Sequence, residues 1–198
     1  MVNKYVFDMG GVITKSYYLR GLYNELNPNT NYTDFKFQFY CSQEALDAYK
    51  GLITIEEYFK KISSLTQTDY RIEELIKMYH AYKGGIYRKT LLIMQFLKER
   101  DNQIYLLSNL NEADHLYLEK NMDMNIFDKQ YLSYEMHKVK PDEEIYMDVI
   151  NDLGTNDFYF FDNSSTNIKA AKQLGIKAFK TTGHNINETM ELIYKQKN

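Results

Sequence analysis

The chain has 198 residues, of which 44% are hydrophobic and 26% charged, and its formal net charge is -3. This length suits one hydrophobic core with a modest insertion, and the acidic balance argues against a broad nucleic-acid-binding surface. No apolar stretch reaches the ~18 residues of a membrane span, and the N-terminus does not resemble a secretory signal. The single Cys41 excludes an internal disulfide. We therefore expect a cytoplasmic protein in which the Cys41 thiol is buried.

Residues 3–7 form a short apolar run that predicts a buried strand, and this strand leads directly into Asp8, Met9, Gly10 and Gly11. A lone buried carboxylate is costly unless a cation or several hydrogen-bond donors accompany it. The glycines allow the backbone to turn sharply and to approach a ligand closely. Taken alone, this pattern is typical of an Asp that caps the next segment, so its meaning depends on partners elsewhere in the chain.

Residues 15–85 contain no convincing strand pattern. Apolar and aromatic residues recur there at helical spacing around 19–26, 35–40, 43–49, 55–62 and 72–79. Thr54, followed by two acidic residues, is typical of a helix N-cap, and Gly51 is typical of a helix end. Gly84 and Gly85 close the segment as a candidate hinge. We therefore predict a helical insertion over 15–85, whose aromatic residues form a core rather than a cofactor site.

After Tyr87 a different pattern begins. A helix is predicted around 91–98, and short apolar runs at 104–107, 130–133, 158–161 and 176–179 alternate with predicted helices around 112–121, 145–150, 168–174 and 188–195. Such alternation is typical of a parallel sheet that helices cover on both faces. The sequence thus predicts an α/β fold with a three-layer, Rossmann-like core made of residues 1–14 and 86–198.

Polar residues follow three of the predicted strands, namely Asp8, Ser108 and Asp162. The carboxyl ends of parallel strands share one edge of the sheet, where such sheets bind ligands. Lys140 lies just before a predicted helix in the same set of loops. Each residue alone is a weak signal, because a Ser at a strand end is usually a cap and a Lys-Pro pair is usually a loop. Their order along one parallel-sheet pattern makes the signal strong.

These residues suit phosphate chemistry. Two carboxylates at one edge repel each other unless a cation lies between them. Asp8, Asp162 and the carbonyl of Gly10 are hard oxygen ligands that suit Mg²⁺, which keeps several of its waters. Ser108 and Lys140 supply donors and a positive charge for three phosphoryl oxygens. A carboxylate that faces a phosphate across a metal can attack it and form an aspartyl-phosphate.

The four segments together resemble the haloacid dehalogenase-like (HAD) hydrolase superfamily. Residues 7–13 resemble its first motif, 106–109 its second, 140–146 its third, and 161–163 with 167–171 and 174–175 its fourth. Residues 51–57 are similar to the helical cap of this family, so the insertion 15–85 is expected to be an all-α cap. Within the superfamily, the chain resembles the branch that holds sugar-phosphate phosphatases, such as glucose-1-phosphatase, and the phosphatase domain of soluble epoxide hydrolase.

The resemblance implies a role for each matching residue. Asp8 is implied as the nucleophile, and Asp8, the Gly10 carbonyl and Asp162 as the Mg²⁺ ligands. The implied catalytic and phosphate-binding partners are Ser108 and Lys140. Asn109 is expected to bind phosphate beside them, with Asn163 and Asn167 in supporting positions.

Two departures from the family pattern stand out. The family usually has a second Asp two residues after the nucleophile, as general acid and base, and this chain has Gly10 there. Its fourth motif usually carries paired acids, and here the second is Asn163. The first change removes a proton donor, and the second is expected to weaken metal affinity.

We therefore expect a magnesium-dependent phosphomonoester hydrolase that acts on a small metabolite, such as a sugar phosphate, and binds neither nucleic acid nor membrane. One alternative is a phosphate-binding module or pseudoenzyme with little turnover. Another is a haloacid dehalogenase, although that reaction has no use for the ligand Asp162. The substrate and the oligomeric state stay open.

Overall fold

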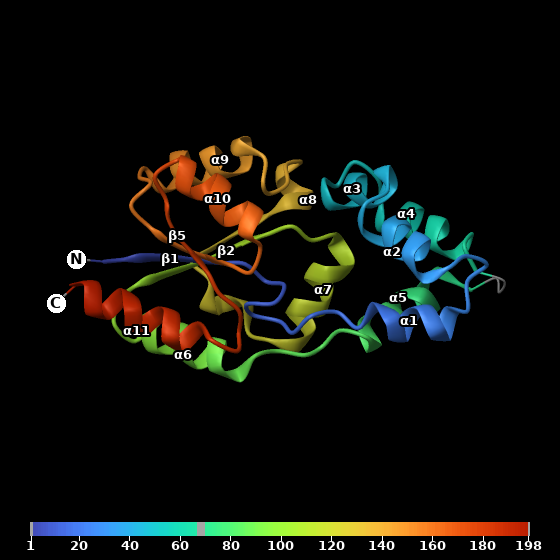
Figure 1. Ribbon diagram of the computed structural model, residues 1–198, viewed down its shortest axis with the longest axis horizontal. Coiled ribbons are helices and arrows are strands. Elements are labelled where there is room, and N and C mark those ends of the chain that lie inside the picture. Colours follow the sequence, from blue (N-terminus) through green and yellow to red (C-terminus); the bar gives the residue numbers. More distant parts are fainter. Residues whose placement is uncertain (1, 67–69, 198) are drawn as a thin grey trace.

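The computed structural model describes residues 2–66 and 70–197 and places one parallel sheet between two layers of helices (Figure 1). The strands are β1 (Lys4–Phe7), β2 (Gln103–Ser108), β3 (Lys129–Leu132), β4 (Tyr159–Asp162) and β5 (Lys177–Lys180). Their order is β3-β2-β1-β4-β5, and every neighbouring pair is parallel. The predicted α/β core is confirmed, and the strand order reverses beside β1, where such sheets bind ligands.

The central strand is apolar on both faces because helices cover both. Tyr5 and Phe7 pack into one cluster with α6 (Arg88–Lys98), α7 (Glu112–Asn121) and α11 (Ile186–Lys197). Val6 points the other way, into a second cluster with α9 (Glu143–Leu153) and α10 (Ser165–Gln173). This burial on two sides explains why the strands read as continuous apolar runs rather than as alternating ones.

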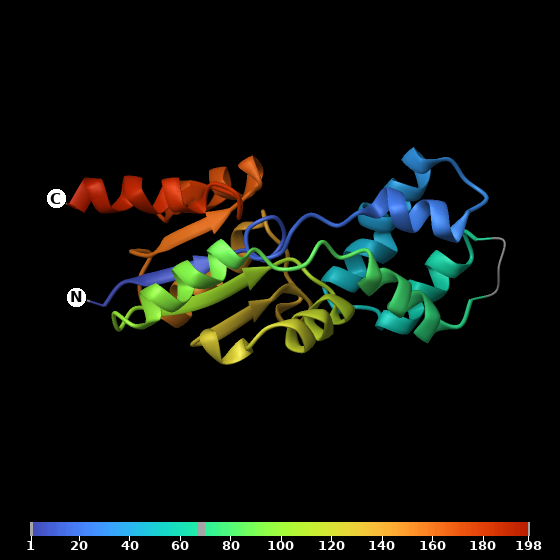
Figure 2. The ribbon, with the colours of Figure 1, turned by 90° about the horizontal axis from the view of Figure 1, so that it is seen from below.

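Residues of the predicted insertion form a block of helices beyond the carboxyl ends of the strands (Figures 1 and 2). These helices are α1 (Leu19–Leu26), α2 (Tyr32–Tyr40), α3 (Gln43–Tyr49), α4 (Ile55–Ser63) and α5 (Ile72–Ala81). They share a hydrophobic core of their own, in which Phe35, Phe39 and Phe59 are almost fully buried. The predicted N-cap at Thr54 is confirmed at the start of α4, where the Thr54 hydroxyl and the Glu57 carboxylate form a reciprocal capping box.

Two chain crossings join the helical block to the core and run side by side. Thr14 pairs with Ile86 in an isolated bridge, and the amide of Lys15 donates to the carbonyl of Gly85 at 2.9 Å. The helices and their separate core agree with a cap over 15–85, and the exact boundaries at 14/15 and 85/86 stay a prediction.

The structure corrects three details. Ser133, expected at the end of a strand, instead opens α8 (Ser133–Met136), and a 3-10 turn, η1 (Met124–Ile126), precedes β3. Both elements are too short to show a helical period in sequence. Cys41, expected to be buried, is exposed because it caps the end of α2 after the last buried residue of that helix. Across the described ranges, no helix is long and apolar enough to cross a membrane.

Candidate active site

The β1 strand delivers Asp8 to the carboxyl edge of the sheet. Its backbone amide donates to the carbonyl of Phe161 on β4 at 2.8 Å, so the two acidic strand ends are held side by side. The loop that follows turns back at once, because the Met9 carbonyl accepts from the amides of Ile13 and Thr14. This tight loop keeps the Asp8 carboxylate beside β4 and largely out of solvent.

Lys140 lies between the two acids. Its ammonium group donates to Oδ1 of Asp8 at 2.7 Å, to Oδ2 of Asp162 at 2.8 Å and to the carbonyl of Leu107 at 2.8 Å. Only 1% of this side chain is exposed, so the buried charge depends on these three acceptors. The predicted convergence of Asp8, Lys140 and Asp162 is therefore present in the structure.

Further hydrogen bonds fix both carboxylates. Ser108, at the end of β2, donates from its hydroxyl to Oδ1 of Asp8 at 3.0 Å. Asp162 accepts from the side chain of Asn167 at 2.9 Å and from the backbone amide of Ser164 at 2.7 Å. The side chain of Asn167 therefore helps to hold the orientation of Asp162.

Asn109 contributes through the backbone of Lys140. Its side-chain amide donates to the Lys140 carbonyl at 2.7 Å, and its side-chain oxygen accepts from the Lys140 amide at 2.8 Å. This pair of bonds ties the loop after β2 to the segment that carries the lysine. The side chain of Asn109, expected at the phosphate, is therefore used to position Lys140.

The structure shows what surrounds Gly10 and Asn163, the two positions that depart from the motif pattern. A side-chain carbon added at Gly10 would meet no other atom within 4 Å, so the position has room for a larger residue. The amide of Asn163 lies directly against Gly11, where a side-chain carbon would overlap it. Asn163 is exposed and packs on the loop after β1.

The site carries an excess of buried negative charge. The pKa of Asp8 is raised to about 6, mainly by burial and in part by the nearby Asp162, against the opposing effects of Lys140 and Ser108. Burial alone would lower the pKa of Lys140, but the two carboxylates raise it overall. With both acids ionised, two negative charges face one ammonium group, and an additional cation would balance them.

The remaining oxygen atoms suit such a cation. Within the described ranges, no hydrogen bond reaches the carbonyl of Gly10, and no cluster of three His, Cys, Asp or Glu side chains able to hold a metal occurs. Two carboxylates and one carbonyl are a hard, incomplete oxygen set. This set fits Mg²⁺, which takes few protein ligands and keeps its waters.

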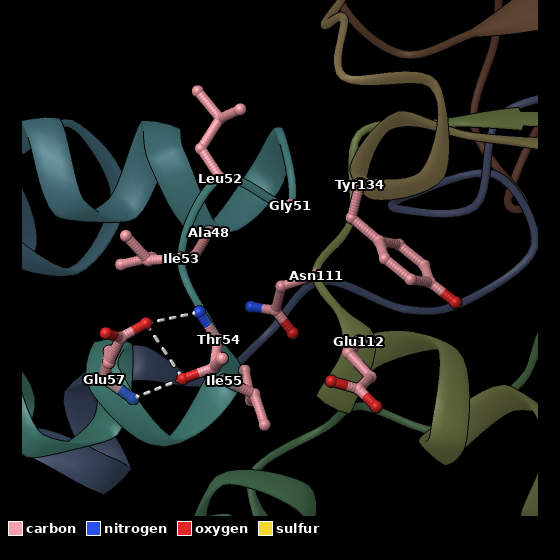
Figure 3. A pocket seen from close by; sticks show the side chains of 10 residues that line it. All are labelled: Ala48, Gly51, Leu52, Ile53, Thr54, Ile55, Glu57, Asn111, Glu112 and Tyr134. Atoms are coloured by element: carbon pink, nitrogen blue, oxygen red, sulfur yellow. Dashed lines mark hydrogen bonds between the residues drawn. The ribbon is translucent and has the colours of Figure 1, made fainter.

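A separate pocket of about 290 Å³ lies between the helical block and the core (Figure 3). Residues 51–55 and Glu57 line it from the helical block, and Asn111, Glu112 and Tyr134 line it from the core. None of the site residues predicted from the sequence lines this pocket. The site residues at the sheet edge are thus distinct from the pocket shown in Figure 3.

Sequence reasoning missed two groups that organise the site. The Leu107 carbonyl, which accepts from Lys140, has no sequence signal because every residue carries a carbonyl. The hydroxyl of Ser133 contacts both the loop after β2 and the helical block. Ser133 follows β3 directly, and β3 pairs with the strand that ends in Ser108. This position at the same sheet edge was the signal that could have identified it.

Comparison with known proteins shows which family the sequence matches. Residues 5–181 match the family model described as haloacid dehalogenase-like hydrolase. The chain is 24% identical over 190 residues to a D-ribitol-5-phosphate phosphatase of Bacteroides thetaiotaomicron, with 91% of this chain and 92% of that protein covered.

Solved structures agree over nearly the whole chain. A HAD family enzyme of Bacteroides thetaiotaomicron, in complex with magnesium and inorganic phosphate, has a TM-score of 0.80 and 26% identity, covering 92% of this chain and 96% of that one. A HAD-like family hydrolase of Porphyromonas gingivalis has a TM-score of 0.80 and 21% identity, covering 98% of both chains, and supports the fold.

Proposed function

This chain belongs to the haloacid dehalogenase-like hydrolase family, and we propose that it hydrolyses phosphate monoesters of small metabolites in a magnesium-dependent reaction. The observation that carries this proposal is the arrangement around Asp8. One oxygen of its carboxylate is held by Ser108 and Lys140, and the other accepts no hydrogen bond within the described chain. An oriented carboxylate with one uncommitted oxygen is suited to attack phosphorus.

In the proposed reaction, Oδ2 of Asp8 forms a bond to phosphorus while the bond to the ester oxygen breaks, and the electron pair leaves with that oxygen. The leaving oxygen takes its proton from solvent, since Gly10 has no acid to supply one. A water molecule then attacks phosphorus and loses a proton to solvent, while the bond between phosphorus and Oδ2 of Asp8 breaks. The electron pair returns to the carboxylate, and inorganic phosphate is released.

Lys140 and Ser108 donate to Oδ1 of Asp8 and keep the nucleophile in one orientation. Positive charge at this place stabilises the charge that develops as phosphorus is attacked. Asp8, Asp162 and the Gly10 carbonyl would hold Mg²⁺, which when bound neutralises charge on the phosphoryl group. Asn167 and Asn109 act through these residues, by fixing Asp162 and the Lys140 backbone.

For the substrate class, we propose a small sugar or polyol phosphate. Two observations support this choice. A relative with 24% identity over nearly the whole chain is a D-ribitol-5-phosphate phosphatase. The helical block stands over the carboxyl edge of the sheet (Figure 2), where it would obstruct a bulky phosphoprotein more than a small ester.

A panel of phosphate esters tests the function. We expect release of inorganic phosphate from five-carbon polyol and sugar phosphates in the presence of Mg²⁺, and its loss in EDTA. The corresponding six-carbon phosphates and a phosphoprotein serve as comparison substrates in the same assay. Binding of phosphate with Mg²⁺, but no turnover of any ester, would contradict the proposal and favour a phosphate-binding module.

A further inference from the structure

Ser133 lies where the helical block, the sheet and the loop after β2 meet. It is the first residue of α8 and is fully buried. Its oxygen accepts a hydrogen bond from the amide of Leu110 at 3.0 Å. The same oxygen lies 2.7 Å from the carbonyl of Tyr49, at the end of α3, and 3.1 Å from the carbonyl of Leu110.

A serine hydroxyl has one hydrogen and therefore donates fully to one acceptor at a time. The Tyr49 carbonyl, in the helical block, is the nearer acceptor and receives this hydrogen when the block is docked. If the block moves away, the Leu110 carbonyl is still within reach. The proton of Ser133 thus has a core acceptor and a helical-block acceptor, and the position of the block decides between them.

The loop that Ser133 contacts carries groups of the active site. Ser108 and Asn109 immediately precede Leu110, and they bind Asp8 and the backbone of Lys140. A change in the hydrogen bonds of Leu110 therefore acts on the segment that orients the nucleophile and the lysine.

We propose that Ser133 is a positioning residue that couples docking of the helical block to the geometry of the loop 108–111. When the block is docked, the Ser133 hydroxyl donates to the Tyr49 carbonyl. The loop is then held by the hydrogen bond from the Leu110 amide to the Ser133 oxygen. The consequence for catalysis rests on the proposed phosphatase function, whereas the coupling itself is a property of the fold.

The contact between Ser133 and Tyr49 can also be disturbed by a substitution in the helical block. Gly51 has a φ of 62°, and a side-chain carbon added there would overlap the backbone carbonyl of Tyr134. Figure 3 shows the Gly51 turn beside the start of α8. Gly51→Ala should therefore push the turn away from Ser133 without altering any residue of the loop 108–111.

A double-mutant cycle of Gly51→Ala and Ser133→Ala tests the coupling. The first measurement is hydrogen exchange at the Leu110 amide, and the second is the split between kcat and KM for a small phosphate ester. We expect Gly51→Ala to slow Leu110 exchange, because the released Ser133 hydroxyl then binds the Leu110 carbonyl while its oxygen still accepts from the Leu110 amide. We also expect it to lower kcat/KM about three- to tenfold, the size of one net hydrogen bond. In the Ser133→Ala background, Gly51→Ala should add little to either measurement.

Two further variants complete the design. Ser133→Thr keeps the hydroxyl and should preserve the response to Gly51→Ala. If Ser133→Ala does not fold, Ser133→Cys replaces it in the cycle, because a thiol is only a weak hydrogen-bond donor and acceptor. His137→Ala removes a neighbouring contact, the 2.8 Å bond between its ring and the Lys50 carbonyl, but leaves the Ser133 hydroxyl in place. Its Leu110 exchange should stay close to that of the unaltered protein.

Equal effects of Gly51→Ala with and without the Ser133 hydroxyl would overturn the proposal, because docking and loop geometry would then be independent. The exchange measurement requires no catalysis. If the unaltered protein turns over no phosphate ester, the proposed function fails, while the exchange cycle still decides whether Ser133 couples the two parts.

Discussion

Lys140 donates to only one oxygen of the Asp8 carboxylate, at 2.7 Å, and Ser108 donates to that same oxygen. The second oxygen is left for other chemistry. Because the same ammonium group also binds Asp162 at 2.8 Å, the two acids are held together around a single positive charge. One ammonium group therefore neutralises the two carboxylates only in part.

Metal removal should abolish activity. Asp8 and Asp162 would share one cation, so EDTA should stop turnover and Mg²⁺ should restore it. Asp162→Asn removes one charge and should weaken Mg²⁺ binding by about tenfold or more, as measured by titration of activity against Mg²⁺. The matched control is Asp157→Asn, in an exposed ion pair with Lys177, which should leave the titration unchanged.

Asp8 should reduce stability at neutral pH in the absence of Mg²⁺. Its pKa is raised from 3.8 to about 6, so its favourable contribution is present below pH 4 and is lost as pH rises through about 6. Asp8→Asn should therefore raise the free energy of unfolding at pH 7 by up to about 3 kcal/mol, measured by urea denaturation in EDTA. Equal stability of the two proteins at pH 7 would contradict this.

His80 should make the junction of the helical block and the core sensitive to acid. Burial lowers its pKa below the ordinary 6.5, and its Nε2 lies 2.8 Å from the carbonyl of Ala113 on α7. The unfolded chain therefore binds the proton more readily, and stability should fall as pH drops below about 6.5. His80→Gln should flatten the slope of unfolding free energy between pH 7 and 5. An unchanged slope would exclude His80 as its source.

Gly10→Asp should restore a general acid and base. Such a group typically raises the reaction rate ~10²- to 10⁴-fold, and position 10 has room for a side chain.

In the unaltered protein we expect a pre-steady-state burst with p-nitrophenyl phosphate. Its leaving group needs no proton, so the first step is fast, whereas the second step lacks a group that activates water. Alkyl phosphates should turn over more slowly. Gly10→Asp should shrink the burst and narrow that gap, whereas a linear time course in the unaltered protein would mean that another group supplies the proton.

The sequence was sufficient to predict the sheet and the residues at its edge. Apolar runs followed by Asp8, Ser108 and Asp162 are local signals, and a parallel sheet brings strand ends together whatever the connections contain. The helical block was also predictable, since the spacing of its apolar residues and the N-cap at Thr54 depend only on neighbours in the chain.

Contacts between distant segments could not be predicted in the same way. The bonds of Lys140 to Leu107 and of Ser133 to Tyr49 use backbone carbonyls, which carry no sequence signature. The expected hinge also has a more specific role. A side-chain carbon at Gly84 would meet the carbonyl of Ser16, and Gly85 has a φ of 76°, so these glycines let the two crossings pack closely.

The most direct test of the account is to trap the phosphorylated enzyme. The protein is mixed with p-nitrophenyl phosphate and Mg²⁺, quenched in acid within the first turnover, and its intact mass and peptides are measured. We predict one added phosphoryl group, located on Asp8 and missing from Asp8→Asn, which should also lose turnover. Full activity of Asp8→Asn, or turnover by the unaltered protein without any phosphorylated Asp8, would contradict the central claim.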